Sequence, residues 1–102
     1  MATLQLLTER VTYLANKYGK EMGATVKIAA TDGVVFIDAR QTPLIISNED
    51  KDADCVISAD TKTAYDLLHG NVNIMSAFMF GKVKIKGDMG IATKMMSMIV
   101  KK

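Results

Sequence analysis

Residues 80–95 of the chain read FGKVKIKGDMGIATKM, and two kinds of periodicity meet within this stretch. In its first half lysine alternates with Val83 and Ile85, which is the period of two that is typical of a β-strand with one buried face. From Gly87 and Asp88 onward, apolar residues recur at three- and four-residue steps, and this spacing predicts a helix with one inward side. A chain that changes its period in this way favours a fold that combines strands with helices, the α+β class.

Four segments upstream also alternate between apolar and other residues. They centre on Val26 and Ile28, on Val34 and Phe36, on Leu44 and Ile46, and on Cys55 and Ile57. The pair Asp32-Gly33 lies between the first two segments and is typical of a tight hairpin turn. Because the connections are short, we expect these four strands to follow one another as an antiparallel meander.

Three further helices are predicted by apolar residues at helical spacing. They span residues 3–18, 61–68 and 74–80. Candidate caps stand at their starts: Thr3 for the first helix, Asp60 or Thr61 for the second and Asn73 for the third. The side-chain oxygens of these residue types accept hydrogen bonds from the free N–H groups of a first helical turn. The helix of residues 3–18 has one apolar stripe, so we expect it to lie against another element.

Length, charge and cysteine usage restrict the classes of protein that this chain fits. Its 102 residues are expected to form one domain, residues 1–102, large enough to bury a core. The 13 basic and 11 acidic residues give a net charge of +2, which is too balanced for a nucleic-acid-binding domain. No apolar run approaches the ~20 residues that cross a bilayer, and residues 1–5 lack the features of a signal peptide. Cys55 is the single cysteine, so we expect a cytoplasmic protein without an internal disulfide.

The sequence offers little to an enzyme or to a metal site. His69 is the single histidine and is expected at a helix end, while Cys55 is expected to be a small buried core residue. Neither is framed by a Cys-His or Ser-His motif. Asp50, Asp52 and Asp54 have the spacing of calcium ligands but lack the glycine and the final glutamate of an EF-hand loop. We therefore expect no catalytic residue, no metal and no cofactor.

Methionine is the residue in surplus. The chain has 8 methionines, and most of them lie between residues 75 and 98. Met95 and Met98 share one face of the predicted last helix while Met96 is turned aside, so this helix is apolar over a broad arc. Thioether side chains adapt to irregular apolar surfaces. Two interpretations stay open, an adaptable core or a surface that meets a ligand or a partner.

Residues 53–58 (ADCVIS) and 76–95 (SAFMFGKVKIKGDMGIATKM) resemble the sterol carrier protein type 2 family, the non-specific lipid-transfer proteins. The resemblance is strong over residues 53–99, and the order of helix and strands over residues 3–47 agrees with it. It implies a five-stranded, mostly antiparallel sheet covered by helices, with an apolar cavity between them. It also implies a protein that binds a fatty acid, acyl-CoA or sterol without covalent chemistry.

Transferred by position, the cavity would be lined by the short helix, the last helix and the inward strand faces. The residues concerned are Phe36, Ile46, Ile74, Ala77, Phe78, Ile91, Met95, Met98 and Ile99. The expected function is the non-catalytic binding or transfer of a lipid or fatty-acyl ligand. The alternative is an accessory or structural protein that uses the same fold, without a ligand, for contacts with another protein or with a second copy in a homodimer.

Overall fold

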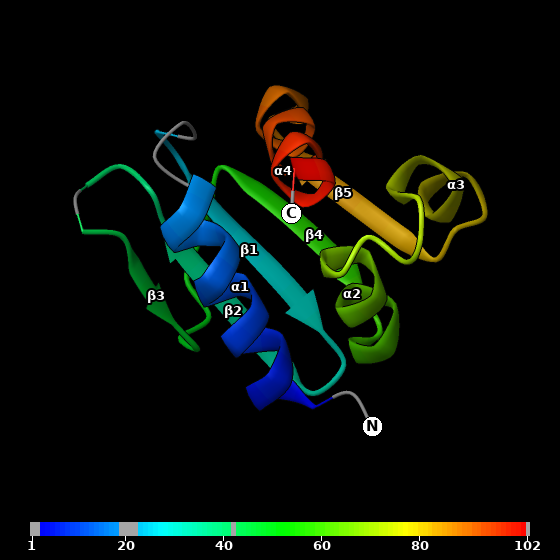
Figure 1. Ribbon diagram of the computed structural model, residues 1–102, viewed down its shortest axis with the longest axis horizontal. Helices are drawn as coiled ribbons and strands as arrows, with labels where there is room; N and C mark the ends of the chain where they lie inside the picture. The colour runs from blue at the N-terminus through cyan, green and yellow to red at the C-terminus, as the bar shows by residue number, and fades with distance from the viewer. Residues whose placement is uncertain (1–2, 19–22, 42, 102) are drawn as a thin grey trace.

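The computed structural model describes residues 3–18, 23–41 and 43–101, apart from the side chains of residues 18, 74, 96 and 98–101. Along the chain the elements are α1 (Leu4–Tyr18), β1 (Thr25–Ala30), β2 (Gly33–Asp38), β3 (Ile45–Ser47), β4 (Cys55–Ala59), α2 (Thr61–Leu68), α3 (Ile74–Met79), β5 (Val83–Gly87) and α4 (Met89–Lys101). The strands form one sheet, and α1, α2 and α4 lie in front of it in Figure 1. An α+β fold with a five-stranded sheet is therefore confirmed.

The sheet has the strand order β3-β2-β1-β4-β5. Its pairings are antiparallel, as expected, except that β1 and β4 run parallel. The predicted four-strand meander is therefore wrong at its last member, because β4 lies beside β1 and not beside β3. The prediction assumed that consecutive strands are neighbours. Instead, β2 and β3 occupy one side of β1 and leave its other edge to β4.

The connection from β3 to β4, residues 48–54, crosses the sheet face from which Lys27 and Phe36 project. Asp50 forms an ion pair with Lys27, with 2.7 Å between Oδ1 and Nζ. The ammonium of Lys51 lies 5.6 Å from the centre of the Phe36 ring. A polar segment thus covers part of the face that the helices leave open, and it carries the chain to the far side of β1.

Asp54 determines where β4 begins. Its backbone N–H donates to Oγ1 of Thr25 (2.9 Å), and its carboxylate accepts from the backbone N–H of Thr25 (3.0 Å). Its carbonyl accepts from the N–H of Asp88 (2.9 Å). The side chain of Asp88 in turn accepts from the N–H of Gly90 (2.8 Å) in the first turn of α4. One residue thereby joins the starts of β1, β4 and α4.

The helices cover the other sheet face and close a single apolar core. α1 packs on β2 and α2, and α4 packs on β4, β5 and α1. The largest fully buried side chains are Leu7, Leu14, Val26, Val35, Ile37, Cys55 and Val83. On β5 the lysines are exposed while Val83 is buried and Ile85 is half-buried, so the alternation predicted for this strand is confirmed.

The predicted helix caps are also confirmed. Thr3 Oγ1 accepts from the N–H of Leu6 (3.1 Å), and the carboxylate of Asp60 accepts from the N–H of Thr63 (2.7 Å). The side chain of Asn73 accepts from two N–H groups in the first turn of α3. These contacts satisfy donors that a helix cannot pair internally, and they set the point at which each helix starts.

Gly87 provides a test of the junction between β4 and β5. Its φ is +94°, and a Cβ at this position would overlap the backbone carbonyl of Asp54. Gly87→Ala should therefore lower the free energy of unfolding by about 2–5 kcal/mol, since strain in φ and a backbone clash add. Gly81→Ala is the matched control, because its φ is +75° but nothing lies within 4 Å of the added carbon. Its cost should be only about 1–2 kcal/mol. Urea unfolding measures the free energy of unfolding of both variants. An equal loss in the two would contradict the close approach of Gly87 to the carbonyl of Asp54.

Candidate functional site

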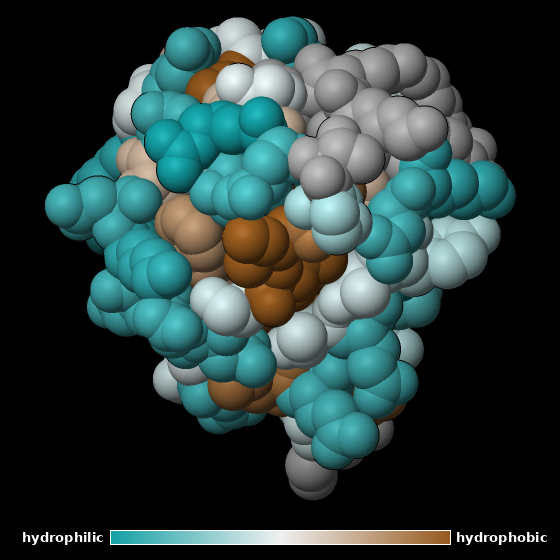
Figure 2. All heavy atoms as spheres, turned by 90° about the vertical axis from the view of Figure 1, so that its left-hand side faces the viewer, coloured by the Kyte–Doolittle hydropathy of each residue, from teal (hydrophilic) through white to brown (hydrophobic). Residues whose placement is uncertain are grey.

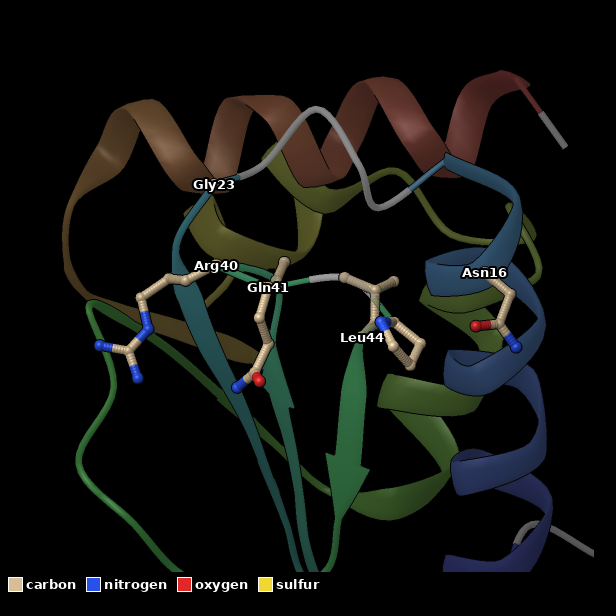
Figure 3. A pocket seen from close by; sticks show the side chains of 7 residues that line it. Asn16, Gly23, Arg40, Gln41 and Leu44 are labelled. Carbon is tan, nitrogen blue, oxygen red and sulfur yellow. The ribbon is translucent and has the colours of Figure 1, made fainter.

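A hollow of about 410 Å³ opens at the end of the sheet where α1 ends and β2 turns toward β3. Its lining residues, shown in Figure 3, are Asn16, Gly23, Ala39, Arg40, Gln41, Pro43 and Leu44. In this view Leu44 lies between Gln41 and Asn16, while the guanidinium of Arg40 points away from α1. The volume is within the range of small-molecule sites, roughly 300–1,000 Å³. We take this hollow as the candidate site.

Asp38 organises the polar side of the hollow. Its carboxylate accepts from the backbone N–H of Arg40 (3.0 Å), from Arg40 Nε (3.0 Å) and Nη2 (2.9 Å), and from Gln41 Nε2 (3.2 Å). The Arg40 guanidinium, followed by its backbone N–H, holds the pKa of the Asp38 carboxyl well below its usual range. Asp38 in turn raises the pKa of Arg40. The carboxylate thus stabilises the turn that presents Gln41 to the hollow.

Apolar residues form the floor of the hollow and continue along β3. Ala39 is buried, and Leu44 is half-buried and packs against the core. On the side of the molecule where β3 forms the sheet edge, apolar residues make a patch framed by polar ones (Figure 2). Ile45 of β3 is 46% exposed there. A ligand in the hollow therefore meets an apolar surface that is continuous with the core.

Four of the predicted site residues share one apolar interior. Ile91 and Met95 of α4 and Ala77 of α3 are buried in the core cluster, and Ile46 of β3 packs against it, as Leu44 does. α4 also contacts α1, whose last turn borders the hollow through Asn16. The hollow and the predicted residues of α4 thus adjoin the same core, and the role of these residues in binding stays a prediction.

Phe36 does not face the helices, so the prediction that it points inward with Ile46 is wrong. It pairs with Lys27 of β1 and with Ser47 of β3, and these residues share the opposite sheet face. Its neighbour Ile37 pairs with Ile46 and enters the core. Phe36 is buried because the crossing segment covers it, and alternation alone does not tell which sheet face the helices choose.

Of the other predicted site residues, the structure describes the side chain of Phe78 alone. Phe78 is at the surface of α3, 42% exposed and outside the core cluster. The side chains of Ile74, Met98 and Ile99 lie outside the described part of the chain. A lipid-binding role for these four residues stays a prediction.

Sequence reasoning missed the polar side of the hollow, which is formed by Asn16, Arg40 and Gln41, and it also missed Asp38, which binds the last two. A signal was present, since residues 38–42 are mostly polar and stand between a buried strand and Pro43, which is typical of a turn. An acidic residue two positions before an arginine also permits a local ion pair. Nothing in the spacing of Asn16 within its helix marked it as part of a site.

Cys55 and His69 both occupy structural positions. Cys55 is fully buried on β4, and burial, followed by the charge of Asp88, raises the pKa of its thiol. His69 is the C-cap of α2, and its ring centre lies 4.3 Å from that of Tyr65. Among residues 3–18, 23–41 and 43–101, no group of three His, Cys, Asp or Glu is arranged to hold a metal ion. In the same ranges no helix has the length and apolar character to cross a membrane.

Comparisons with known proteins agree on one family. The model of the SCP-2 sterol transfer family matches residues 5–100. Sterol carrier protein 2 of Oryctolagus cuniculus is 41% identical over 54 residues, which are 53% of this chain but only 10% of the length of that protein. The sterol carrier protein domain 2 of Helicoverpa armigera superposes with a TM-score of 0.77 at 19% identity, over 95% of this chain and 84% of that one. UbiJ-SCP2, a ubiquinone synthesis protein, superposes with a TM-score of 0.71 at 15% identity, over 95% of this chain and 96% of that one.

Asp38→Asn tests the ion pair beside the hollow. A carboxylate with a lowered pKa in the folded state stabilises the fold at pH values above its unfolded pKa, about 3.9, and this contribution is lost as the pH falls below that value. The variant should therefore be less stable than the wild type at neutral pH. This difference in the free energy of unfolding should become smaller on acidification below about pH 4. Asp52→Asn, which removes an exposed carboxylate, is the control. A gap in urea midpoint that is the same at neutral and acid pH would contradict the role of Asp38.

Proposed function

The chain belongs to the SCP-2 sterol transfer family, and from this premise we propose that it binds the apolar part of a lipid in the hollow and carries it without catalysing a reaction. The observation that carries the proposal is the meeting of a polar rim with an apolar floor at an open end of the core. An amphiphilic lipid has the same two parts. The ligand class is a lipid or fatty-acyl compound with a small polar head.

The rim suits a head group that forms hydrogen bonds. The amides of Asn16 and Gln41 lie on opposite sides of Leu44 and supply both donors and acceptors (Figure 3). They match a hydroxyl, a carbonyl or a carboxylate. Arg40 is already paired with Asp38, so the described part of the rim carries no net charge. A neutral head group can therefore enter without leaving a charge unpaired.

The apolar chain of the ligand would extend from Leu44 toward α4. Ile91, Ala92 and Met95 attach α4 to the core. An empty cavity of about 300 Å³ would lower the free energy of unfolding by on the order of 7 kcal/mol, at ~24 cal/mol per Å³. The whole free energy of unfolding of a domain of this size is only about 5–15 kcal/mol. The proposal is therefore that the ligand creates part of its own space by displacing flexible methionine side chains, as thioethers permit.

The absence of catalysis in this proposal is supported by the roles of Cys55 and His69. The thiol is fully buried with a raised pKa, which disfavours the nucleophilic thiolate. His69 closes α2 and lies beside Tyr65. A cytoplasmic location is part of the same proposal and is supported by the single cysteine.

The free edge of β3 favours one second candidate, an accessory protein without a ligand. Among the strands that the structure describes, β3 pairs with β2 alone, and Ile45 is 46% exposed on this edge. Exposed edge strands pair readily with another chain. In this case a second copy or another protein would cover the apolar patch of β3, and the same surface would not be available to a lipid.

Leu44 and Ile45 form a matched pair for testing the lipid proposal. They are adjacent, but Leu44 lines the hollow while Ile45 is exposed on the sheet edge. The wild type should bind a fluorescent fatty acid with a Kd in the micromolar range, about −8 kcal/mol. Leu44→Asn should weaken this binding at least about tenfold, because the amide removes apolar contact with the ligand chain. Ile45→Asn should leave it nearly unchanged.

Two results would contradict the proposal. Saturable binding that is absent for fatty acids, acyl-CoA and sterols alike would remove the lipid function. A dimer that Ile45→Asn dissociates, together with no lipid binding by the wild type, would favour the accessory function instead.

A further inference from the structure

α3 carries strongly exposed apolar side chains at the end where the chain turns into β5. Met79 is 80% exposed and Phe80 is 81% exposed, and Met75 on the same short helix is 54% exposed. Ala77 is the described residue of α3 that enters the core. Figure 1 shows α3 projecting beside β5, away from α1. Apolar side chains that project to this degree usually contact a partner or a membrane.

Lysines follow directly on these apolar residues. Lys82, Lys84 and Lys86 are all exposed, and none of them has an ion-pair partner in the part of the chain that the structure describes. Lys84 lies opposite Ser58, and Lys86 lies opposite Val56. The adjacent β4 residues are thus neutral, and the positive charge of β5 is left uncompensated on the sheet face that the helices do not cover.

A shallow hollow joins the lysines to the end of α3. Its volume is about 340 Å³, and its lining includes Ser58, Gly81, Lys82 and Lys84. Gly81 connects Phe80 to Lys82, so the apolar tip and the basic hollow are contiguous. The charge of Asp60 reaches Lys82, but the carboxylate of Asp60 caps α2 by accepting from the N–H of Thr63. The hollow therefore offers two ammonium groups and a hydroxyl to an anion.

We propose that α3 and β5 form a docking surface for an anionic lipid bilayer. Met79 and Phe80 enter the boundary between head groups and acyl chains, where interfacial segments bury their apolar side chains. Lys82, Lys84 and Lys86 then contact anionic head groups, with one phosphate in the shallow hollow. Stable attachment to a membrane generally takes two signals, such as an apolar insertion and a basic patch, and this surface combines them.

The positive charge of the β5 lysines favours a bilayer over a second copy of the chain as the partner of this surface. A symmetric dimer through α3 would bring the lysines of β5 against those of the other copy, and like charges at an interface are unfavourable. An anionic membrane compensates the same charges. The surface lies apart from the hollow beside α1, so docking leaves that hollow open, and the proposal does not depend on the identity of the bound lipid.

The test is sedimentation of the full chain with vesicles of phosphatidylcholine, with and without phosphatidylserine, at low and high salt. The wild type should bind only the anionic vesicles, and salt should weaken the binding because exposed charges are screened. The double variant Met79→Ser/Phe80→Ser should bind at least about tenfold more weakly. The double variant Lys82→Gln/Lys84→Gln should bind anionic vesicles about fivefold more weakly for each lysine removed, and its binding should depend less on salt.

Controls lie on α1, away from this surface. Tyr13→Ser removes an aromatic residue that is 47% exposed, and Lys17→Gln removes one exposed charge. Both should bind vesicles as the wild type does. Failure of the wild type to bind anionic vesicles, or an equal loss in the α1 controls, would overturn the proposal. So would a dimer that Met79→Ser/Phe80→Ser dissociates. Fatty-acid binding by the same variants separates a failure of this proposal from a failure of the lipid-binding function.

Discussion

Asp54 links β1, β4 and α4 through three hydrogen bonds, each of which has a backbone N–H as its donor. Two of them lock it to Thr25 at the start of β1, and the third reaches Asp88 at the start of α4. The parallel register of β1 and β4 begins at this point, and Gly87 is the residue whose small size lets β5 approach it. Because β4 lies between β1 and β5 and α4 packs on it, an error in its placement would displace β5, α3 and α4 together.

The two sheet faces acquire different properties from this arrangement. One face is closed by α1, α2 and α4 over Val26, Val35 and Ile57, and its open end beside α1 is the candidate lipid site. The other face is covered only in part by residues 48–54, and it keeps the lysines of β5 in contact with solvent. Storage of an apolar ligand and attraction to an anionic surface can therefore reside in separate parts of one small domain.

The sequence predicts those features that depend on neighbouring residues. The alternation around Val83 and Ile85, and the caps at Thr3, Asp60 and Asn73, are local, and the structure confirms them. Which strand pairs with β4 depends on which edge of β1 is free, and this is set by residues far apart in the sequence. The length of the connection alone therefore predicts the wrong neighbour for β4. The face of Phe36 was misjudged for a similar reason, because an alternating strand has the same pattern whichever face the helices cover. Asn16 and Gln41 line one hollow only because the end of α1 folds against the β2–β3 turn, and the local spacing of residues does not predict this contact.

Paramagnetic relaxation in the ¹⁵N-labelled protein, with a fatty acid that carries a nitroxide on its acyl chain, locates the bound lipid. If the ligand occupies the proposed site, the amide signals of Asn16, Ala39, Gln41 and Leu44 should broaden on addition of the fatty acid. Those of Lys84 and Lys86 should keep their intensity. Broadening centred on α3 and β5, or no broadening at saturating ligand, would contradict the claim that the lipid binds between the end of α1 and the β2–β3 turn.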